Sequence, residues 1–490
     1  MMATDNPNPR SATLPVNQAG STDPSDRSTA DRASAGSAAS VAPWVGGVAQ
    51  SRISELSDAY QDLALDQVAG EVRAQLREHH RSFEQDGIVL YAGTNILSAE
   101  AAAAHDGALS TRPSLGWPGA KVQTGMEHVE ALEVLATQLV ARSMHARFAE
   151  VRFPTATMAN LAVYTVLANP GDTIAVLSPA AGGHSSHHQD GAASIRALNV
   201  VHLPYDADVF DVDLGQLDAF LEHHAPRIVV IGGSVALFPH DVATIRRACD
   251  RVDAFLLYDA SHNAGLIAAG LFQDPLAEGA HVVTFSTYKS YAGPAGGAAV
   301  TNDERLAEAL SLTAHPVMTS NYDTGRLGPL AIAAAEMIAK GHDILQPALS
   351  FAQQLAVELE NYGLPMIGAA KCYTQTHQIL IDAGRFGTGR EACGLLTRAG
   401  IHVGAGHSPR EPVGSPAMGI RVGTQELVRS GAGPEHLAPI ADLIARVLID
   451  QEAPELVRPD TLRIRQSFGS AVDVAVDTAI DAPADAEAKV

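Results

Sequence analysis

Cysteine is scarce in this sequence of 490 residues. The three cysteines, Cys249, Cys372 and Cys393, are far apart, odd in number and form no CxxC pair. This pattern argues against a disulfide framework and against a zinc site built on cysteines. We therefore expect the protein to work in a reducing cytoplasm.

Basic residues are also scarce, and long hydrophobic runs are missing. The chain has 33 Lys and Arg against 55 Asp and Glu, which gives a net charge of −22 at pH 7. No run of about five basic residues occurs, whereas binding nucleic acid requires a surface rich in Lys and Arg. No stretch of about 18 apolar residues exists to cross a membrane, and residues 1–18 lack the basic and apolar segments of a secretion signal. The sequence thus predicts small-molecule ligands, with neither nucleic acid nor membrane as a partner.

Both ends of the chain have compositions that are typical of disorder. Residues 1–50 are dominated by Ala, Ser, Gly and Pro, and such a segment buries too little apolar surface to offset the entropy of ordering. Residues 469–490 alternate Ala and Val with aspartates, which predicts an acidic tail. Between these tails we predict an N-terminal helical arm over 51–108, a large domain over 109–326 and a small C-terminal domain over 327–468.

The middle of the chain alternates short apolar runs with longer amphipathic stretches, which is typical of a parallel α/β fold. The predicted strands, each short and apolar enough to be buried on both faces, are 173–177, 200–203, 228–231, 254–258 and 281–285. Amphipathic helices over 331–340 and 351–361 introduce a second, smaller α/β region. Ligands of open α/β sheets bind beyond the carboxyl ends of the strands, so the residues directly after these runs are the first candidates for a site.

A carboxylate and a lysine follow two neighbouring predicted strands. Asp259 comes directly after the strand 254–258, and Lys289 comes shortly after the strand 281–285. Pyridoxal phosphate requires this combination, because a lysine forms a Schiff base with its aldehyde and a carboxylate keeps its pyridine nitrogen protonated. A polar strand end would explain Asp259 alone. Together with Lys289, it favours a pyridoxal-phosphate site.

Two further segments carry groups that suit such a cofactor. The Thr-Ala-Thr segment 155–157 precedes a predicted helix, and hydroxyls and amides at a helix N-terminus bind phosphate well, although an ordinary threonine cap explains the same residues. His184, His187 and His188 follow another strand and suggest a metal site. No Asp or Glu of suitable spacing accompanies these histidines, so we favour stacking of the His184 ring on the cofactor over a metal.

One arginine stands out near the C-terminal side. Residues 418–423 form a short predicted strand whose single charged residue is Arg421. A lone arginine is ordinarily a solvated or paired surface residue. Because glycine and apolar residues flank Arg421, its planar guanidinium can instead bind a substrate carboxylate.

Several ordered motifs now form a recognisable set. They are Gly116-Trp117-Pro118-Gly119, Gly125-Met126-Glu127, Gly182-Gly183-His184, Asp259-Ala260-Ser261-His262-Asn263-Ala264-Gly265-Leu266, Lys289 with Gly293-Pro294-Ala295-Gly296-Gly297, and Gly419-Ile420-Arg421-Val422-Gly423-Thr424. From about 90 to 431 the chain resembles the serine hydroxymethyltransferases, which are fold-type-I pyridoxal-phosphate enzymes. The resemblance implies an aspartate aminotransferase-like α/β fold, with a large, mostly parallel seven-stranded sheet domain and a smaller C-terminal α/β domain.

The resemblance also implies roles for the matching residues. Lys289 would form the Schiff base, Asp259 would pair with the pyridine nitrogen, and His184 would stack on the ring. The implied cofactor-binding set is Thr155, Ala156, Thr157, His184, Asp259, His262, Ser286, Lys289 and Gly328, with His262 at the phenolic oxygen and Thr155 and Thr157 at the phosphate. The implied substrate-binding set is Asn95, Gln123 and Arg421, and no metal is implied. The resemblance further implies a homodimer with shared active sites, in which Gly328 reaches the phosphate from the partner chain.

The sequence departs from the family at residues that handle folate. Leu115 stands where the family has the glutamate that works with the folate-borne one-carbon unit, and Val122 and Gln123 replace paired tyrosines. Further departures are Gly93-Thr94-Asn95 for Ser-Glu-Asn, Thr155-Ala156-Thr157 for Ser-Gly-Ser, and Tyr288 for the histidine before the Schiff-base lysine. A leucine neither donates nor accepts a proton, so the cofactor residues are kept while the folate residues are not.

These departures predict cleavage at the Cα–Cβ bond of a β-hydroxy amino acid without folate. The cofactor ring takes up the negative charge left on Cα, and a base that removes the β-hydroxyl proton releases an aldehyde. The candidate base is His184, directly or through water, with Tyr288 and His187 as alternatives that the sequence does not rank. We therefore predict a threonine, serine or glycine aldolase or transaldolase.

Two other functions stay open at this point. One is a divergent folate-dependent hydroxymethyltransferase that acts on serine or an α-substituted serine, with the missing glutamate supplied from elsewhere. The other is a cofactor-binding partner subunit without turnover, although the joint presence of Lys289, Asp259, His262 and Arg421 speaks against it. β-Elimination, transamination and decarboxylation are also open to this cofactor, because the site selects a reaction by the bond that it aligns.

Overall fold

The structure is a computed structural model that describes residues 42 and 44–469. Most of the predicted N-terminal tail and all of 470–490 lie outside the described residues. Among these residues the chain divides into two compact units, one ending at Gln75 and the other beginning at Leu76. In the first unit, helix α1 spans Gly47–Tyr60 and has no buried side chain.

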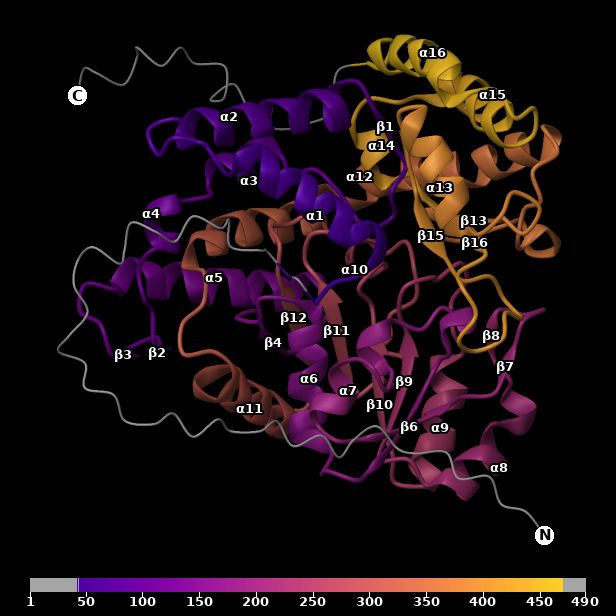
Figure 1. Ribbon diagram of the computed structural model, residues 1–490. Coiled ribbons are helices and arrows are strands. Elements are labelled where there is room, and N and C mark those ends of the chain that lie inside the picture. Colours follow the sequence, from indigo (N-terminus) through magenta and orange to yellow (C-terminus); the bar gives the residue numbers. More distant parts are fainter. Residues whose placement is uncertain (1–41, 43, 470–490) are drawn as a thin grey trace, which may run out of the picture. The chain divides into compact units, whose positions relative to one another are not determined.

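A seven-stranded sheet forms the centre of the second unit (Figure 1). Its strands, in spatial order, are β4 (Phe148–Glu150), β12 (Gly297–Thr301), β11 (Val282–Ser286), β10 (Phe255–Asp259), β9 (Ile228–Gly232), β5 (Thr173–Val176) and β6 (Asn199–His202). Only β12 runs against its neighbours, β4 and β11. The predicted parallel α/β sheet is therefore confirmed, and each of the five predicted strands is displaced by at most one residue at either end.

Helices cover both faces of this sheet, as the apolar strands require. Alternate residues of β9 enter different cores: Val229 and Ile231 pack in one, Ile228 and Val230 in the other. The first core contains residues of α5 (Glu127–Ser143), α8 (Leu214–His224), α9 (Val242–Arg251), α10 (Ala264–Ala268) and α12 (Leu327–Asn361). The second contains residues of α6 (Ala156–Leu167), α7 (Ala192–Ile195) and α11 (Glu304–Leu312). Strands buried on both faces read as continuous apolar runs, which explains why the sequence revealed them.

A smaller α/β region follows the large sheet along the chain. Helix α12 is one continuous helix of 35 residues, where the sequence predicted two helices separated by the segment around Gly341 and Pro347. A three-stranded antiparallel sheet has the order β13 (Gln378–Asp382), β16 (Gly419–Gly423), β15 (Gly404–Gly406). Helices α13 (Gly389–Arg398), α15 (Leu437–Leu448) and α16 (Pro454–Gln466) share a core with it.

The segment that leads into the large domain also joins this C-terminal core. Strand β1 (Ile88–Val89) pairs in parallel with β14 (Ile401–His402). Ile88 and Leu90 are fully buried in the core of the smaller region. The chain after Leu90 therefore begins beside β16, where Arg421 lies. Within the described part of the chain, no helix has the length and apolar character needed to span a bilayer.

Candidate active site

The carboxyl edge of the large sheet brings the predicted lysine and aspartate into one buried site. Asp259 is the last residue of β10, and Lys289 follows the neighbouring strand β11. Lys289 is 8% exposed, and its Nζ lies 3.1 Å from Nε2 of His262. Burial lowers the pKa of the Lys289 amine to about 8, with the charge of Asp259 opposing and that of Arg421 reinforcing the effect.

Asp259 is held by three donors. Its Oδ2 lies 2.8 Å from Nε2 of His187 and 3.3 Å from Nδ2 of Asn160, and its Oδ1 accepts the Ser261 backbone N–H at 2.9 Å. Burial alone would raise the pKa of this carboxyl. The hydrogen bond and charge of His187 outweigh burial and hold the pKa of Asp259 well below its usual range. Asp259 is therefore a buried anion that can face a protonated ring nitrogen.

His187 continues this network away from the site. Its Nδ1 lies 2.5 Å from the Tyr164 hydroxyl of helix α6, while its Nε2 contacts Asp259. Both ring nitrogens are thus engaged, and the side chain is buried. His187 cannot serve as the base that the sequence left open, because it has no free nitrogen facing a substrate. The sequence missed its contact with Asp259, which joins residues 72 positions apart.

His184 begins a short 3₁₀ turn, Ser185–His187, after β5. Its Nδ1 accepts the Ser186 backbone N–H at 3.1 Å and lies 2.8 Å from the Ser186 hydroxyl oxygen. Burial lowers the pKa of His184 to about 4, so the ring is neutral near pH 7. A neutral, partly buried ring at this edge suits stacking on an aromatic ligand.

His262 lies between the two cationic side chains of the site. Its Nε2 is 3.1 Å from the Lys289 amine and 3.3 Å from Nη1 of Arg421. Burial and these two charges keep the pKa of His262 well below its usual range. Since Nε2 accepts, Nδ1 carries the ring hydrogen, and this buried donor has no hydrogen-bond partner in the structure.

Arg421 is buried rather than solvated, so the alternative interpretation as a surface arginine is wrong. It lies on β16 and is 8% exposed. Its Nη1 donates to the Ser234 carbonyl oxygen at 2.6 Å, and its buried Nε has no partner. Among the described residues, no carboxylate forms an ion pair with Arg421. A buried guanidinium that lacks a counter-charge suits a ligand carboxylate.

The predicted phosphate segment lies at the start of α6. The helix begins at Ala156, because Thr155 is its N-cap and accepts the Met158 N–H at 3.2 Å. The cap interpretation is thus confirmed for Thr155, and the N–H groups of the first turn still point out of the helix. A Cβ on Gly297 would lie 2.5 Å from the Ala156 nitrogen, so β12 approaches this turn as only glycine allows. Ser286 ends the neighbouring strand and is buried.

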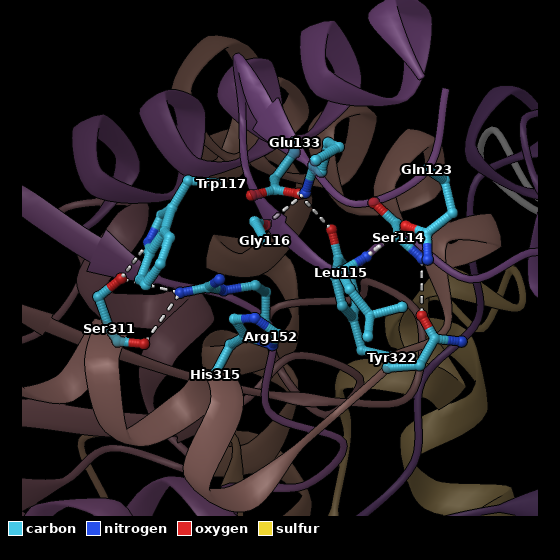
Figure 2. Close-up of polar contacts among 12 residues, drawn as sticks. Ser114, Leu115, Gly116, Trp117, Gln123, Glu133, Arg152, Ser311, His315 and Tyr322 are labelled. Carbon is cyan, nitrogen blue, oxygen red and sulfur yellow. Dashed lines mark hydrogen bonds and ion pairs between the residues drawn. The ribbon is translucent and has the colours of Figure 1, made fainter. Parts of the chain in front are cut away.

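Leu115 and Gln123 lie in a hairpin whose strands are β2 (Gly116–Trp117) and β3 (Ala120–Lys121). Figure 2 shows this hairpin: the Gln123 side-chain oxygen accepts the Leu115 backbone N–H at 3.0 Å. The Lys121 amine, buried at the hairpin base, contacts Glu133 at 2.6 Å. The amide oxygen of Gln123 is therefore already hydrogen-bonded within the hairpin.

The remaining predicted residues lie in different surroundings. The Asn95 amide donates to the Lys289 carbonyl oxygen at 3.0 Å, which places it in the site. Tyr288 is 36% exposed. Gly328 lies in the first turn of α12, where a Cβ would meet the Ala104 carbonyl oxygen at 2.8 Å. Among the described residues, no hydrogen bond joins Leu115, Gln123 or Gly328 to the lysine, the aspartate or the arginine of the site.

His377 is a further site residue that sequence reasoning missed. It is fully buried, and neither ring nitrogen has a partner. Burial and the charges of Arg421 and Lys289 lower its pKa to about 3. The signal in the sequence was weak, because a single histidine just before the strand β13 is equally typical of a core. Within residues 42 and 44–469, no three His, Cys, Asp or Glu side chains are arranged to hold a metal ion.

These residues fit pyridoxal phosphate on the chemistry of their donors. The site offers a buried amine of lowered pKa, an anionic aspartate and a neutral histidine with an unused N–H. A helix N-terminus lies at the same sheet edge. An aldehyde, a pyridine nitrogen, a phenolic oxygen and a phosphate would each find a matching group.

Comparison with known proteins agrees with this geometry. Residues 65–444 match the family described as serine hydroxymethyltransferase. The chain belongs to this family. The resemblance found in the sequence and the fold-type-I architecture are thereby confirmed, and the chain is a pyridoxal-phosphate-dependent enzyme of the serine hydroxymethyltransferase type.

Individual relatives of the serine hydroxymethyltransferase family carry different names. An α-methylserine aldolase from Ralstonia sp is 37% identical over 426 residues, which cover 87% of this chain and 97% of that protein. A serine hydroxymethyltransferase from Korarchaeum cryptofilum is 36% identical over 81% of this chain and 95% of its own length. The solved structure of an L-threonine transaldolase from Pseudomonas fluorescens has a TM-score of 0.76 at 25% identity, covering 88% of this chain and 98% of that one.

Proposed function

We propose that the protein is an aldolase or transaldolase that breaks or forms the Cα–Cβ bond of β-hydroxy amino acids without folate. The substrates that we propose are threonine, serine and α-substituted serines such as α-methylserine. One observation carries the proposal. The cofactor and carboxylate groups are gathered in one buried site, whereas the hairpin carries Leu115 and Gln123 in place of proton-transferring side chains.

Four groups of this chain would hold the cofactor. Lys289 would bind it covalently through its amine, Asp259 would pair with its ring nitrogen, and His262 would donate Nδ1–H to its phenolic oxygen. The first turn of α6, with Thr155 and Thr157, would hold its phosphate. When bound, pyridoxal phosphate supplies a ring that takes up the electron pair left on Cα.

Arg421 and Asn95 would position the substrate. Arg421 offers its unpaired Nε and the outer guanidinium edge to the carboxylate, and the Ser234 carbonyl oxygen fixes the opposite edge. Asn95 holds the backbone of Lys289 and so sets where the amine points. When Arg421 binds the substrate carboxylate, the Cα–Cβ bond remains free to rotate until it is perpendicular to the cofactor ring, which is the orientation that cleavage requires.

Cleavage also needs a group that accepts the β-hydroxyl proton. We assign this role to His184, because its ring is neutral and His187 has no free nitrogen. In the structure Nδ1 of His184 accepts the Ser186 backbone N–H, so for Nε2 to accept a proton the ring hydrogen has to move from Nε2 to Nδ1, which lies 2.8 Å from the Ser186 hydroxyl oxygen. When Nε2 takes the proton, the C–O bond becomes a carbonyl and the aldehyde leaves.

Folate-dependent hydroxymethyl transfer is the second candidate, favoured by the 36% identity to the Korarchaeum cryptofilum enzyme. Leu115 speaks against this second candidate. A leucine cannot transfer a proton to or from a folate-borne one-carbon unit, and no tyrosine replaces it in the hairpin.

Aldehyde release with and without tetrahydrofolate separates the two candidates. We expect the holoenzyme to release acetaldehyde from threonine, or formaldehyde from α-methylserine, at the same rate with and without tetrahydrofolate, and calorimetry to detect no binding of the reduced folate. Release that depends strictly on folate would overturn the proposal. Leu115→Glu is the matched variant: it restores a carboxyl and should leave the folate-free rate within about threefold of the parent if Leu115 does no chemistry.

A further inference from the structure

Tyr91, which follows β1, fills a slot between two glycines. A Cβ on Gly93 would lie 2.8 Å from Cε1 of the Tyr91 ring, and a Cβ on Gly404 would lie 2.5 Å from its Cε2. Contacts this short do not occur between real atoms, so neither position tolerates a side chain while the ring is in place. The slot exists because both neighbours are glycine.

The ring in this slot faces the guanidinium of Arg421. The guanidinium carbon lies 5.9 Å from the ring centroid, which is within the range of a cation–π contact. Burial lowers the pKa of Arg421, and Tyr91 is the first group to counteract that effect. Among the described residues no carboxylate forms an ion pair with Arg421, so no ion pair supplements this ring contact.

The backbone on both sides of Tyr91 is fixed to the strands around Arg421. The Leu90 N–H donates to the His402 carbonyl oxygen at 2.8 Å, and the Gly423 N–H donates to the Leu90 carbonyl oxygen at 2.8 Å. The amide of Gln425 donates to the Thr94 carbonyl oxygen at 2.7 Å. The backbone that carries the ring is therefore bonded to β16, the strand that carries the arginine, as well as to β14 and to Gln425.

We propose that Tyr91 is a positioning residue that holds the guanidinium of Arg421 in the plane needed to receive the substrate carboxylate, and so determines the preference for amino acids over amines that lack a carboxylate. Gly93 and Gly404 are part of this device, because they leave room for the ring. The inference rests on the proposed function for the identity of the carboxylate that Arg421 binds.

Two ligands that differ only in the carboxylate test the role of Tyr91. Glycine and methylamine are titrated into the holoprotein, and dissociation constants are taken from calorimetry and from the change in cofactor absorbance. Tyr91→Ala should raise the dissociation constant of glycine about 3- to 30-fold and leave that of methylamine unchanged. In the same variant, KM for a β-hydroxy amino acid should rise by a larger factor than kcat falls. Equal weakening of both ligands, or no change, would overturn the inference.

Two variants accompany this titration. Tyr91→Phe keeps the ring in its slot, so it should retain most of the discrimination; a loss as large as that in Tyr91→Ala would show that the ring does not position the guanidinium. Tyr362→Ala, which removes a ring at the far end of α12, is the matched control and should bind both ligands as the parent does.

The slot itself gives a second, independent test. Gly93→Ala in the parent protein places a methyl group against the Tyr91 ring and should weaken glycine binding in the same way as the loss of Tyr91. In the Tyr91→Ala background the methyl group meets empty space, so Gly93→Ala should add little. Equal effects of Gly93→Ala in both backgrounds would contradict the slot.

The outcomes also separate this inference from the proposed function. If no β-hydroxy amino acid releases an aldehyde but the preference for glycine over methylamine still depends on Tyr91, the proposed function fails and the inference stands. If aldehyde is released and Tyr91→Ala leaves the preference unchanged, the inference alone fails.

Discussion

Lys289 differs from an ordinary lysine by its surroundings. It is buried beside a histidine and an arginine, and burial lowers the pKa of its amine to about 8. An amine attacks an aldehyde only in its unprotonated form. At physiological pH a useful fraction of Lys289 is therefore ready to react, which an exposed lysine would not offer.

This lowered pKa predicts how fast the apoprotein takes up pyridoxal phosphate. Below pH 8 the fraction of neutral amine rises about tenfold for each pH unit, and above it the fraction levels off. We expect the rate constant of cofactor uptake, followed by visible absorbance, to rise with pH and become constant above about pH 8. A rate that keeps rising to about pH 10 would indicate an unperturbed amine.

The contact between His187 and Asp259 makes a prediction about cofactor affinity. His187→Leu removes the hydrogen bond that lowers the pKa of Asp259, and a bond to a charged group contributes about 1.5–3 kcal/mol. We expect the dissociation constant for pyridoxal phosphate to rise about 10- to 100-fold. Tyr164→Phe removes only the outer hydrogen bond to His187 and should raise the same dissociation constant about 5-fold. Unchanged affinity in both variants would show that Asp259 does not hold the cofactor.

Helix α14 (Gln425–Arg429) follows β16 and contains a carboxyl with an unusual pKa. Burial raises the pKa of Glu426 to about 7, while a hydrogen bond from Thr94 lowers it in part. Glu84 and Arg465 are the charged groups that face it, and they act in opposite directions. The helix also holds the loop before Asn95, since Gln425 donates to the Thr94 carbonyl oxygen.

The stability of the protein should therefore depend on the charge of Glu426. Glu426 loses its proton near pH 4.5 when unfolded but near pH 7 when folded, so the stability that its protonated form provides is complete below about pH 4.5 and is lost as pH rises through about 7. Glu426→Gln should raise the free energy of unfolding at about pH 8 by about 1–3 kcal/mol and change it little at about pH 4.

A surface variant serves as the control for this stability measurement. Glu222→Gln on α8 removes a charge from an exposed position and should be neutral at both pH values. Chemical denaturation at the two pH values measures the difference. Equal effects of Glu426→Gln at both pH values would contradict the raised pKa.

The strands and helices also show what the sequence could predict. The five parallel strands were predictable because each is an apolar run buried on both faces, and their ends predicted Asp259 and Lys289 correctly as neighbours. Strands β4 and β12 were missed, because β4 has three residues and β12 is composed mainly of glycine and alanine. The predicted helices 331–340 and 351–361 are parts of the single helix α12, which continues through Pro347 in its interior.

The contacts between distant segments could not be predicted from one sequence. The His187–Asp259 bond and the Asn95–Lys289 bond join residues 72 and 194 positions apart. The periodicity of apolar residues in a sequence gives no information about such long-range contacts. The Tyr91 slot was also beyond prediction, since it depends on the meeting of Gly93 and Gly404 around one ring.

At the scale of the whole enzyme, we propose a homodimer with shared sites. The support is that Gly328 and the hairpin residues form no hydrogen bond to Lys289 or Asp259 within the described residues of one chain. The role that the resemblance implies for Gly328 would then be exercised in the partner's site.

Mixing two variants tests this arrangement, once each alone is shown to be inactive. Lys289→Ala lacks the amine, and Leu115→Arg places a side chain longer and bulkier than that of Leu115→Glu in the hairpin, which we expect to obstruct a site that the hairpin adjoins. If each site combines the lysine of one chain with the hairpin of the other, dimers exchanged at a one-to-one ratio should regain about one quarter of parental activity, because half are mixed and each has one intact site. A mixture without activity would mean that one chain supplies the whole site.

The account as a whole depends on a covalent bond between Lys289 and pyridoxal phosphate. Borohydride reduction of the purified holoprotein, followed by mass spectrometry of its peptides, tests this bond most directly. We predict that the cofactor mass is found on the peptide that contains Lys289, and that Lys289→Ala shows neither this mass nor the visible absorption band. A protein that stays colourless with added pyridoxal phosphate, or that carries the label on another lysine, would contradict the account.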